Sequence, residues 1–387
     1  MNPVYLDFQA TTPTDEQVVK KMLPFFTKDF GNPHSVSHVF GDQANKSIEN
    51  ARTLIAENLG AKPSEIIFTS GATESNNLAL KGGMNYRAKY DKRTELVIVC
   101  TEHKCVIEAA KKLSLTGVKV TNINVDSLGI VDLEQLNNIL NDKVAIVSVM
   151  IANNEIGVIQ PLKQISKICK KHDVWMHTDA AQAIGNIKID VNKLGIDLMS
   201  ISGHKVYGPK GVGALYFRRN PRVRLIPEID GGGQEKLIRS GTVPTPLVVG
   251  LGEAIKLSYQ NFDHNKDHIM NLRNKLYEDL YNSISDISIN GPSFRDSDLR
   301  LHNNINISIP GVDGTELVSE LGSKVAFSTG SACSTGDIEP SYVLKSIGLS
   351  DDLAMSSVRI SVGRKTSLEE IEYAVEMIIK KVKLLRK

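Results

Sequence analysis

The chain of 387 residues contains few cysteines, a single tryptophan and no marked excess of either sign of charge. Its four cysteines include no Cys-x-x-Cys pair, which argues against a disulfide framework and favours a reducing compartment. No apolar run approaches the roughly 20 residues of a membrane span. The 46 basic and 44 acidic residues nearly cancel, so bulk charge predicts neither a nucleic-acid nor a membrane partner.

Short apolar runs rich in β-branched residues alternate with helical patterns over the first part of the chain. One such helix is expected at 161–172, where Leu162, Ile165, Ile168 and Cys169 share a face. Continuous apolar runs are typical of strands buried on both faces, and the alternation predicts an α/β fold with a mostly parallel sheet wrapped by helices. The expected strands are 65–70, 95–101, 118–125, 143–150, 174–179, 197–202 and 212–217.

The pattern changes after Pro246. A charged helical stretch at 248–284 is followed by expected strands at 303–309 and 358–362 and by a closing helix at 367–387. This order indicates a smaller α+β domain. We expect a large domain over 16–263, and a smaller one that joins 1–15 to 264–387.

Chemically active side chains follow the expected strands, and in an open parallel sheet that edge binds ligands. Each group also has an ordinary interpretation, since Ser-Gly-Ala-Thr starts many helices and a single histidine is most often structural. Five such groups at one edge are harder to explain in that way. They are "SGATESNN" from 70, "EHK" from 102, "ANNEIG" from 152, "HTDAAQ" from 177 and "GHKVYGPKG" from 203.

These groups fit an aromatic phosphate ester that carries an aldehyde. The helix start "TSGATESN" supplies backbone N–H groups and hydroxyls for an anion. Asp179 can meet a ring cation, His103 can stack on a ring, and Lys205 can form a Schiff base beside Ser202 and His204. Phosphate, pyridinium and aldehyde together describe pyridoxal phosphate.

Cys333 lies in "AFSTGSACSTG" (326–336), among small and polar residues. Buried structural cysteines have apolar neighbours, so this thiol is the one expected to react. Cys100 and Cys169 are expected in the core, and Cys105 is assigned no role.

Motifs along nearly the whole chain resemble those of the cysteine desulfurases of iron–sulfur assembly, in the class V aminotransferase group. The residues of the motifs "GNPHS" and "EPSYVLKSIG" favour the mitochondrial and alphaproteobacterial branch. The resemblance implies a fold-type I pyridoxal phosphate enzyme. The matching motifs include "YLDFQATTP" (5–13), "GNPHS" (31–35), "FTSGATESNN" (68–77), "TEHK" (101–104), "NNEIGVIQP" (153–161), "HTDAAQ" (177–182), "SISGHKVYGPKGVGALY" (200–216), "GGGQEKLIRSGT" (231–242), "STGSACSTG" (328–336) and "VRISVGR" (358–364).

The resemblance also implies the roles of single residues. Cys333, Lys205 and His103 would be catalytic, with Cys333 as the sulfur acceptor and Lys205 as the lysine bonded to the cofactor. The cofactor would further contact Ala72, Thr73, Asn154, Asp179, Gln182, Ser202, His204 and Thr242, with Thr242 reaching the phosphate of a partner subunit. Asn154 and Arg359 would orient the substrate, with Arg359 on its carboxylate.

The implied reaction takes sulfur from L-cysteine, leaves L-alanine, and places a persulfide on Cys333 for transfer to a scaffold protein. The small residues around Cys333 would let that segment move between the cofactor and the acceptor. A homodimer without an intrinsic metal is implied, although Cys333 could transiently ligate a cluster shared with the scaffold. The expected location is the cytoplasm, or the mitochondrial matrix if a presequence precedes this sequence. Two alternatives stay open: a selenocysteine lyase or other class V enzyme, and a catalytically idle scaffold homologue.

Overall fold

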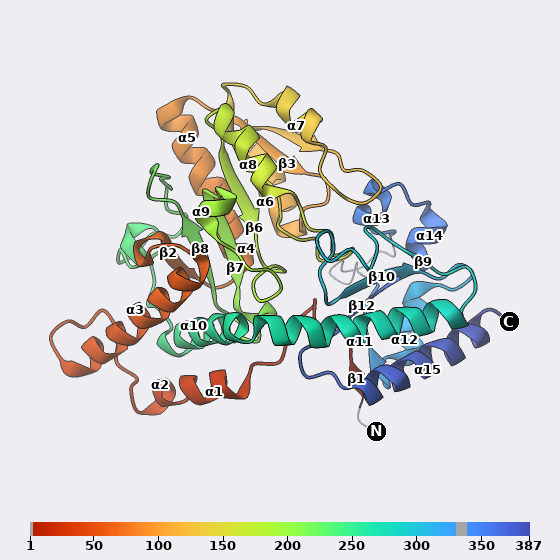
Figure 1. Ribbon diagram of the computed structural model, residues 1–387. Coiled ribbons are helices and arrows are strands. Elements are labelled where there is room, and N and C mark those ends of the chain that lie inside the picture. Colours follow the sequence, from red (N-terminus) through yellow and green to blue (C-terminus); the bar gives the residue numbers. More distant parts are fainter. Residues whose placement is uncertain (1–2, 330–338) are drawn as a thin grey trace.

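A computed structural model describes residues 3–329 and 339–387 (Figure 1). In these ranges the strands form one seven-stranded, one three-stranded and one two-stranded sheet. The order of the large sheet is β2 (Ile66–Thr69), β8 (Gly213–Phe217), β7 (Leu198–Ser202), β6 (Trp175–Asp179), β5 (Val144–Ser148), β3 (Glu95–Val99) and β4 (Lys119–Ile123). β8 is antiparallel to both neighbours and all other pairs are parallel, which confirms the predicted α/β class.

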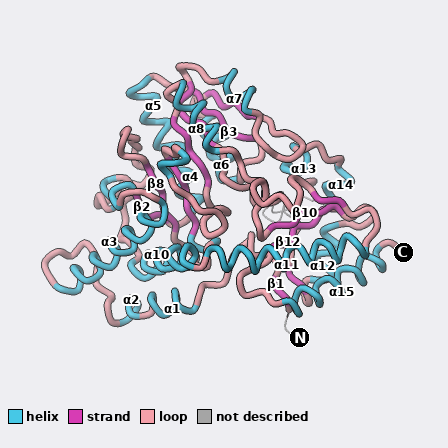
Figure 2. The backbone as a smooth tube through the Cα atoms, in the orientation of Figure 1, coloured by secondary structure: helices cyan, strands magenta, loops and turns pink. Residues whose placement is uncertain are grey.

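Alternate residues of the large sheet enter two different cores, as the period of a strand requires. Ile66 and Phe68 join the core beneath α3, α8 and α10, whereas Ile67 packs on the opposite face. Helices therefore cover both faces of the strands, as the tube in Figure 2 also shows. The helices of this region are α1 (Glu16–Met22), α2 (Pro24–Thr27), α3 (Val39–Leu59), α4 (Ala72–Asn77), α5 (Gly83–Asp91), α6 (Lys104–Ser114), α7 (Leu133–Ile139), α8 (Leu162–Lys171), α9 (Val191–Leu194) and α10 (Thr245–Gln260).

The expected strands and the helix at 161–172 are present, and the edges differ by one or two residues. Of the apolar face predicted for α8, Leu162, Ile165 and Cys169 are buried and Ile168 is half-buried. The charged stretch at 248–284 forms two helices, α10 and α11 (Phe262–Ser283), which meet at Asn261.

A second core lies around the three-stranded sheet of β12 (Ser357–Ser361), β10 (Asn304–Ser308) and β9 (Ser288–Ile289). It is closed by α11 and by α12 (Gly314–Leu321) and α15 (Leu368–Leu385). α13 (Tyr342–Ser346) and α14 (Asp351–Met355) follow the undescribed residues 330–338. The boundary placed at residue 263 stays a prediction.

The N-terminal residues Val4–Leu6 belong to this second core. β1 (Val4–Tyr5) pairs in parallel with β11 (Val325–Ala326), and the backbone N–H of Ser361 donates to the carbonyl of Leu6. The chain then runs on toward the carboxyl edge of the large sheet, where it meets the candidate site. No helix within residues 3–329 and 339–387 is long and apolar enough to span a bilayer.

Candidate active site

A cavity of about 550 Å³ opens at the carboxyl ends of β2, β5, β6 and β7. The second core contributes Arg359 of β12 to its wall. Ten of the predicted site residues line this one cavity, which is the clustering that parallel strand ends predict. They are Ala72, Thr73, His103, Asn154, Asp179, Gln182, Ser202, His204, Lys205 and Arg359.

Asp179 ends β6 at the floor of the cavity and is only 5% exposed. Its carboxylate accepts from Asn76 Nδ2 at 2.7 Å and from the backbone N–H of Ala181 at 2.8 Å. Both donors are neutral, and no lysine, arginine or histidine among the described residues forms a salt bridge with Asp179. A buried carboxylate of this kind is suited to a cationic ring nitrogen.

His103 begins α6 as its N-cap, and its Nδ1 accepts from the backbone N–H of Cys105 at 3.2 Å. A neutral ring therefore carries its proton on Nε2. Burial lowers the pKa of His103, although the charge of Asp179 opposes that shift. The thiol of Cys105 lies 3.0 Å from Nδ1 and 3.0 Å from Asn76 Nδ2. Burial, together with Asp179, raises the pKa of Cys105 to about 12, so this thiol stays protonated and holds the ring of His103 in place.

Lys205 follows β7, and its Nζ donates to the carbonyls of Gln9 and Ala10 at 2.5 and 2.8 Å. His204 contacts Thr11 Oγ1 at 3.0 Å through Nδ1. Burial lowers the pKa of His204 to about 4, with Lys205 and Lys210 adding to the effect, and the ring is neutral at pH 7.

The turn at the end of β2 is held by a side chain of the helix that it opens. Glu74 accepts from the backbone N–H of Ser70 at 2.8 Å and from Arg239 Nε at 2.7 Å. Gly213 allows the turn to lie against β8, because a Cβ there would sit 2.6 Å from the Cα of Gly71. The N–H groups of the first helical turn lack helical partners, and Ala72 and Thr73 of that turn line the cavity.

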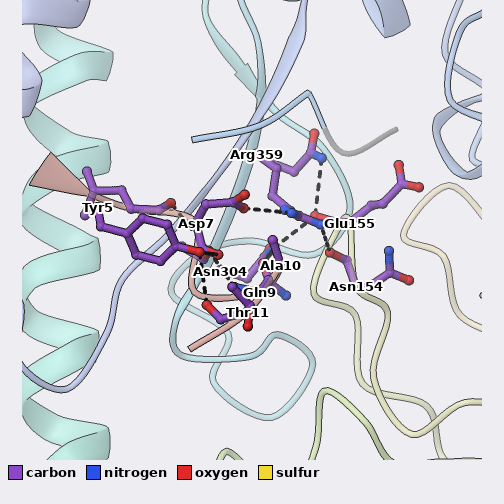
Figure 3. A network of polar contacts seen from close by, with 12 residues as sticks. Tyr5, Asp7, Gln9, Ala10, Thr11, Asn154, Glu155, Asn304 and Arg359 are labelled. Atoms are coloured by element: carbon purple, nitrogen blue, oxygen red, sulfur yellow. Dashed lines mark hydrogen bonds and ion pairs between the residues drawn. The ribbon is translucent and has the colours of Figure 1, made fainter. Parts of the chain in front are cut away.

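Arg359 lies at the other side of the cavity, on β12, and is 4% exposed. Its Nη1 donates to the carbonyl of Asn154 and its Nη2 to Asp7 Oδ1, each at 2.8 Å (Figure 3). Nε of Arg359 and Oδ1 of Asn154 are buried without a partner among the described residues.

Two predicted residues are not brought into this cavity. Thr242 is exposed and does not line it, and Cys333 lies outside the described residues. Cys169 is buried as predicted, whereas Cys100 is only half-buried. Within 3–329 and 339–387, no three His, Cys, Asp or Glu side chains are grouped so that they could hold a metal ion.

Sequence reasoning missed two parts of the site. The first is the segment Gln9–Thr11, which lines the cavity from the N-terminal end of the chain. Its motif, "YLDFQATTP", was noted in the sequence, but no helical or strand periodicity indicated that it would line the cavity. The second is Glu102, which is fully buried, accepts from the backbone N–H of Met150 at 2.5 Å, and leaves Oε2 without a partner in the described structure. Burial and the charge of Asp179 raise the pKa of Glu102 to about 8.

The family model of the class-V aminotransferases matches residues 4–374. The chain belongs to the class-V aminotransferase family. It is 49% identical over 385 residues to a protein of Rickettsia prowazekii (strain Madrid E) named cysteine desulfurase IscS, and the match covers 100% of this chain and 92% of that one. The predicted family is thereby confirmed.

Solved structures agree with this membership. A NifS-like protein superposes with a TM-score of 0.91 at 36% identity, covering 99% of this chain and all of the other. A structure titled SspA in complex with cysteine superposes with a TM-score of 0.81 at 36% identity, covering 94% of this chain and all of that one. Within the class-V aminotransferases the chain therefore groups with the cysteine desulfurases.

The residues of this class-V aminotransferase fit pyridoxal phosphate. Asp179 is a buried carboxylate without a cationic partner in the described structure, which suits the pyridinium nitrogen. Lys205 reaches the same cavity and would hold the group covalently through Nζ. The turn at Ala72 and Thr73, with Ser202 and His204, would receive the phosphate.

Proposed function

We propose that the protein is a cysteine desulfurase that takes sulfur from L-cysteine, releases L-alanine, and carries the sulfur as a persulfide on Cys333 for iron–sulfur cluster assembly. One observation carries this proposal. The same cavity is lined by Lys205, Asp179, His103 and Arg359. Membership in the cysteine desulfurase group supports the same activity. Pyridoxal phosphate, when bound, supplies an electron sink for the substrate Cα.

The chain's own residues orient the substrate and the cofactor. Asp179 keeps the ring nitrogen protonated, because a buried anion favours a charged partner. Gln182 and Asn154 line the same wall and would bond polar atoms of the cofactor and substrate. Arg359 lines the cavity and would bind the substrate carboxylate through the N–H groups of Nη1 and Nη2 that Asn154 and Asp7 leave unused.

His103 is the residue placed to donate a hydrogen bond at the reacting centre. Its Nδ1 accepts from the backbone N–H of Cys105, so Nε2 is the ring nitrogen that carries the proton and remains for the substrate. The lowered pKa keeps the ring neutral at pH 7, so His103 offers the substrate an Nε2–H donor and no second positive charge.

Cys333 acts as the nucleophile on the sulfur of the substrate. Its thiolate attacks that sulfur, the carbon–sulfur bond breaks, and protonation at the carbon gives alanine. The thiol is thereby converted to a persulfide, and no further oxidant is needed. Cys105 is not an alternative nucleophile, because its thiol is protonated at neutral pH.

The experiment that tests the activity measures alanine and sulfide from L-cysteine, with and without an iron–sulfur scaffold protein. A cysteine desulfurase releases one alanine for each sulfur, and a scaffold that accepts sulfur raises the rate. Turnover of L-selenocysteine with none of L-cysteine would instead identify a selenocysteine lyase. Absence of both, in a protein that holds the cofactor, would indicate an idle homologue.

The proposal includes a homodimer with shared sites. Thr242 is exposed and lies outside its own chain's cavity, which is where a residue that serves a partner's phosphate would be. Large apolar side chains are also exposed between residues 19 and 40, more than a single chain ordinarily leaves in one region. They are Val19, Leu23, Phe26, Phe30, Val36, Val39 and Phe40.

Complementation tests the shared site. Mixed dimers of Lys205→Ala and Thr242→Ala subunits contain one site in which both residues are intact. We expect such mixtures to regain part of the activity that each variant lacks. No recovery after verified subunit exchange would contradict sharing. The proposed location is the cytoplasm, a reducing compartment in which free cysteines persist.

A further inference from the structure

The N-terminal segment Tyr5–Thr11 connects the second core to the active-site cavity, and it touches functional groups at several points. Its carbonyls at Gln9 and Ala10 accept from Lys205, as described above. Asp7 accepts from Arg359 Nη2 across 352 positions of sequence. The segment therefore reaches the cofactor lysine, and it also reaches the arginine proposed for the substrate, as Figure 3 shows for Asp7 and Arg359.

The hydrogen bonds of Arg359 fix its guanidinium plane. A guanidinium carries five N–H donors in one plane. One donor of Nη1 is taken by the Asn154 carbonyl, one donor of Nη2 is taken by Asp7, and Nε is buried without a partner among the described residues. Two anchors at the terminal nitrogens prevent rotation about the side chain's last bonds. The N–H groups of Nη1 and Nη2 that these two bonds leave unused then keep one direction.

We propose that Asp7 is a positioning residue, which holds the guanidinium of Arg359 in the orientation that receives the carboxylate of the substrate. This inference rests on the proposed role of Arg359. Asp7 itself does not touch the substrate in this scheme. It acts through the plane of Arg359.

Asp7 can serve this purpose because its own position is rigid. The hydroxyl of Tyr5 donates to the carbonyls of Asp7 and Thr11, at 3.0 and 3.1 Å, and so closes the turn that contains them. Asp7 also bridges to Ser361 of β12, two residues from Arg359, and the backbone N–H of Gln9 donates to Ser361 Oγ at 2.9 Å. The backbone that carries the carboxylate is therefore joined directly to β12, the strand that carries the guanidinium.

Two roles of Asp7 predict opposite effects of removing its charge, and the direction in which substrate affinity changes distinguishes them. If Asp7 orients Arg359, Asp7→Asn weakens substrate binding because the guanidinium can rotate away. If Asp7 only neutralises Arg359, the same change strengthens binding, since the arginine then presents its whole charge to the substrate carboxylate.

A second ion pair, formed by a residue shortly after the segment Tyr5–Thr11, provides a matched control. Asp15 pairs with Arg364, three residues beyond β12, and both side chains are about as buried as Asp7 and Arg359. Neither Asp15 nor Arg364 lines the active-site cavity. Asp15 is the N-cap of α1 through a bond from the backbone N–H of Gln17, and asparagine caps helices equally well. Asp15→Asn therefore removes an ion pair between the same two parts of the chain without touching Arg359.

The test compares holoenzymes of wild type, Asp7→Asn, Asp7→Glu and Asp15→Asn. We expect Asp7→Asn to raise KM for L-cysteine roughly five- to twentyfold with kcat changed less than about threefold, the range for two residues in direct contact. Asp7→Glu keeps the charge and should restore most of the affinity. Asp15→Asn should leave KM within about twofold of wild type.

A double-mutant cycle and a binding measurement complete the test. With Arg359→Ala present, Asp7→Asn should change KM less than about twofold, because there is no guanidinium left to orient. Calorimetric binding of L-alanine should show the same loss as KM, independently of turnover. An unchanged or lowered KM in folded Asp7→Asn, or an equal rise in Asp15→Asn, would overturn the inference. If the wild type binds L-alanine more tightly than Asp7→Asn but does not turn over L-cysteine, the proposed function alone is refuted. If the wild type neither binds L-alanine nor turns over L-cysteine, both proposals are refuted.

Discussion

Glu102 should make the stability of the protein fall as the pH rises from acid to mildly alkaline values. This carboxyl is fully buried beside the active site, and its Oε2 has no partner among the described residues. Burial is the main reason that its pKa is raised to about 8, and the charge of Asp179 adds to it. The informative perturbation is Glu102→Gln, which keeps an oxygen to accept from the backbone N–H of Met150 but cannot ionise.

The sign follows from proton linkage. Between the ordinary pKa of 4.5 and about 8, the unfolded chain has released the proton and the folded protein still holds it. Each rise in pH within that window therefore favours the unfolded state. The stabilisation that comes from the protonated Glu102 is fully present below pH 4.5 and lost above about pH 8. At 1.36 kcal/mol per pH unit the ceiling is about 5 kcal/mol. Divided by the unfolding entropy of a chain of this length, that free energy corresponds to a change in apparent Tm of at most about 6 °C.

The assay is thermal unfolding of the cofactor-free protein at several pH values from 5 to 8.5. Glu102→Gln should gain stability relative to wild type as the pH rises. Glu74→Gln is the control, because Arg239 and the backbone N–H of Ser70 outweigh the effect of burial and hold the pKa of Glu74 below its ordinary value. Its contribution is constant above that value, so its profile should run parallel to wild type over this range. A parallel profile for Glu102→Gln as well would refute the reasoning.

Three further outcomes are expected. Lys205→Ala should lose the cofactor that borohydride traps in the wild type, and trapping on another lysine, detected by peptide mass spectrometry, would show that the assignment is wrong. Glu235→Gln should lower the Tm by about 4–6 °C, because Arg52 donates to Glu235 with two nitrogens at 2.8 Å and loss of one member of such a buried pair costs about 3–5 kcal/mol. Replacing both members with Arg52→Met and Glu235→Leu should recover most of that loss, and no recovery would contradict the electrostatic explanation. Cys333→Ser should keep the fold and the cofactor but lose sulfur transfer, and a persulfide found on Cys105 in the wild type would contradict the mechanism.

The strands and their chemical ends could be predicted because both depend on local sequence. Runs such as Glu95–Val99 are buried on both faces, so their composition alone marks them as strands of a parallel sheet. The residues that follow them then meet at one edge by topology, which is why Asp179 and Lys205 were predicted together. The short strands β1, β9 and β11 were not predicted, because two residues carry no periodicity.

The amino-acid sequence by itself determined the sheet and the family, and it predicted the edge of the sheet where the cavity lies, because strand composition and the residues at strand ends each depend on a few neighbouring positions. Only the tertiary structure decided what completes the cavity. Asp7 and Arg359 are 352 positions apart, and Glu102 shares its environment with Met150 and Asp179 from two other segments. Ion pairs and burial of this kind depend on how distant segments pack against one another, and no local period of a strand or helix specifies that packing.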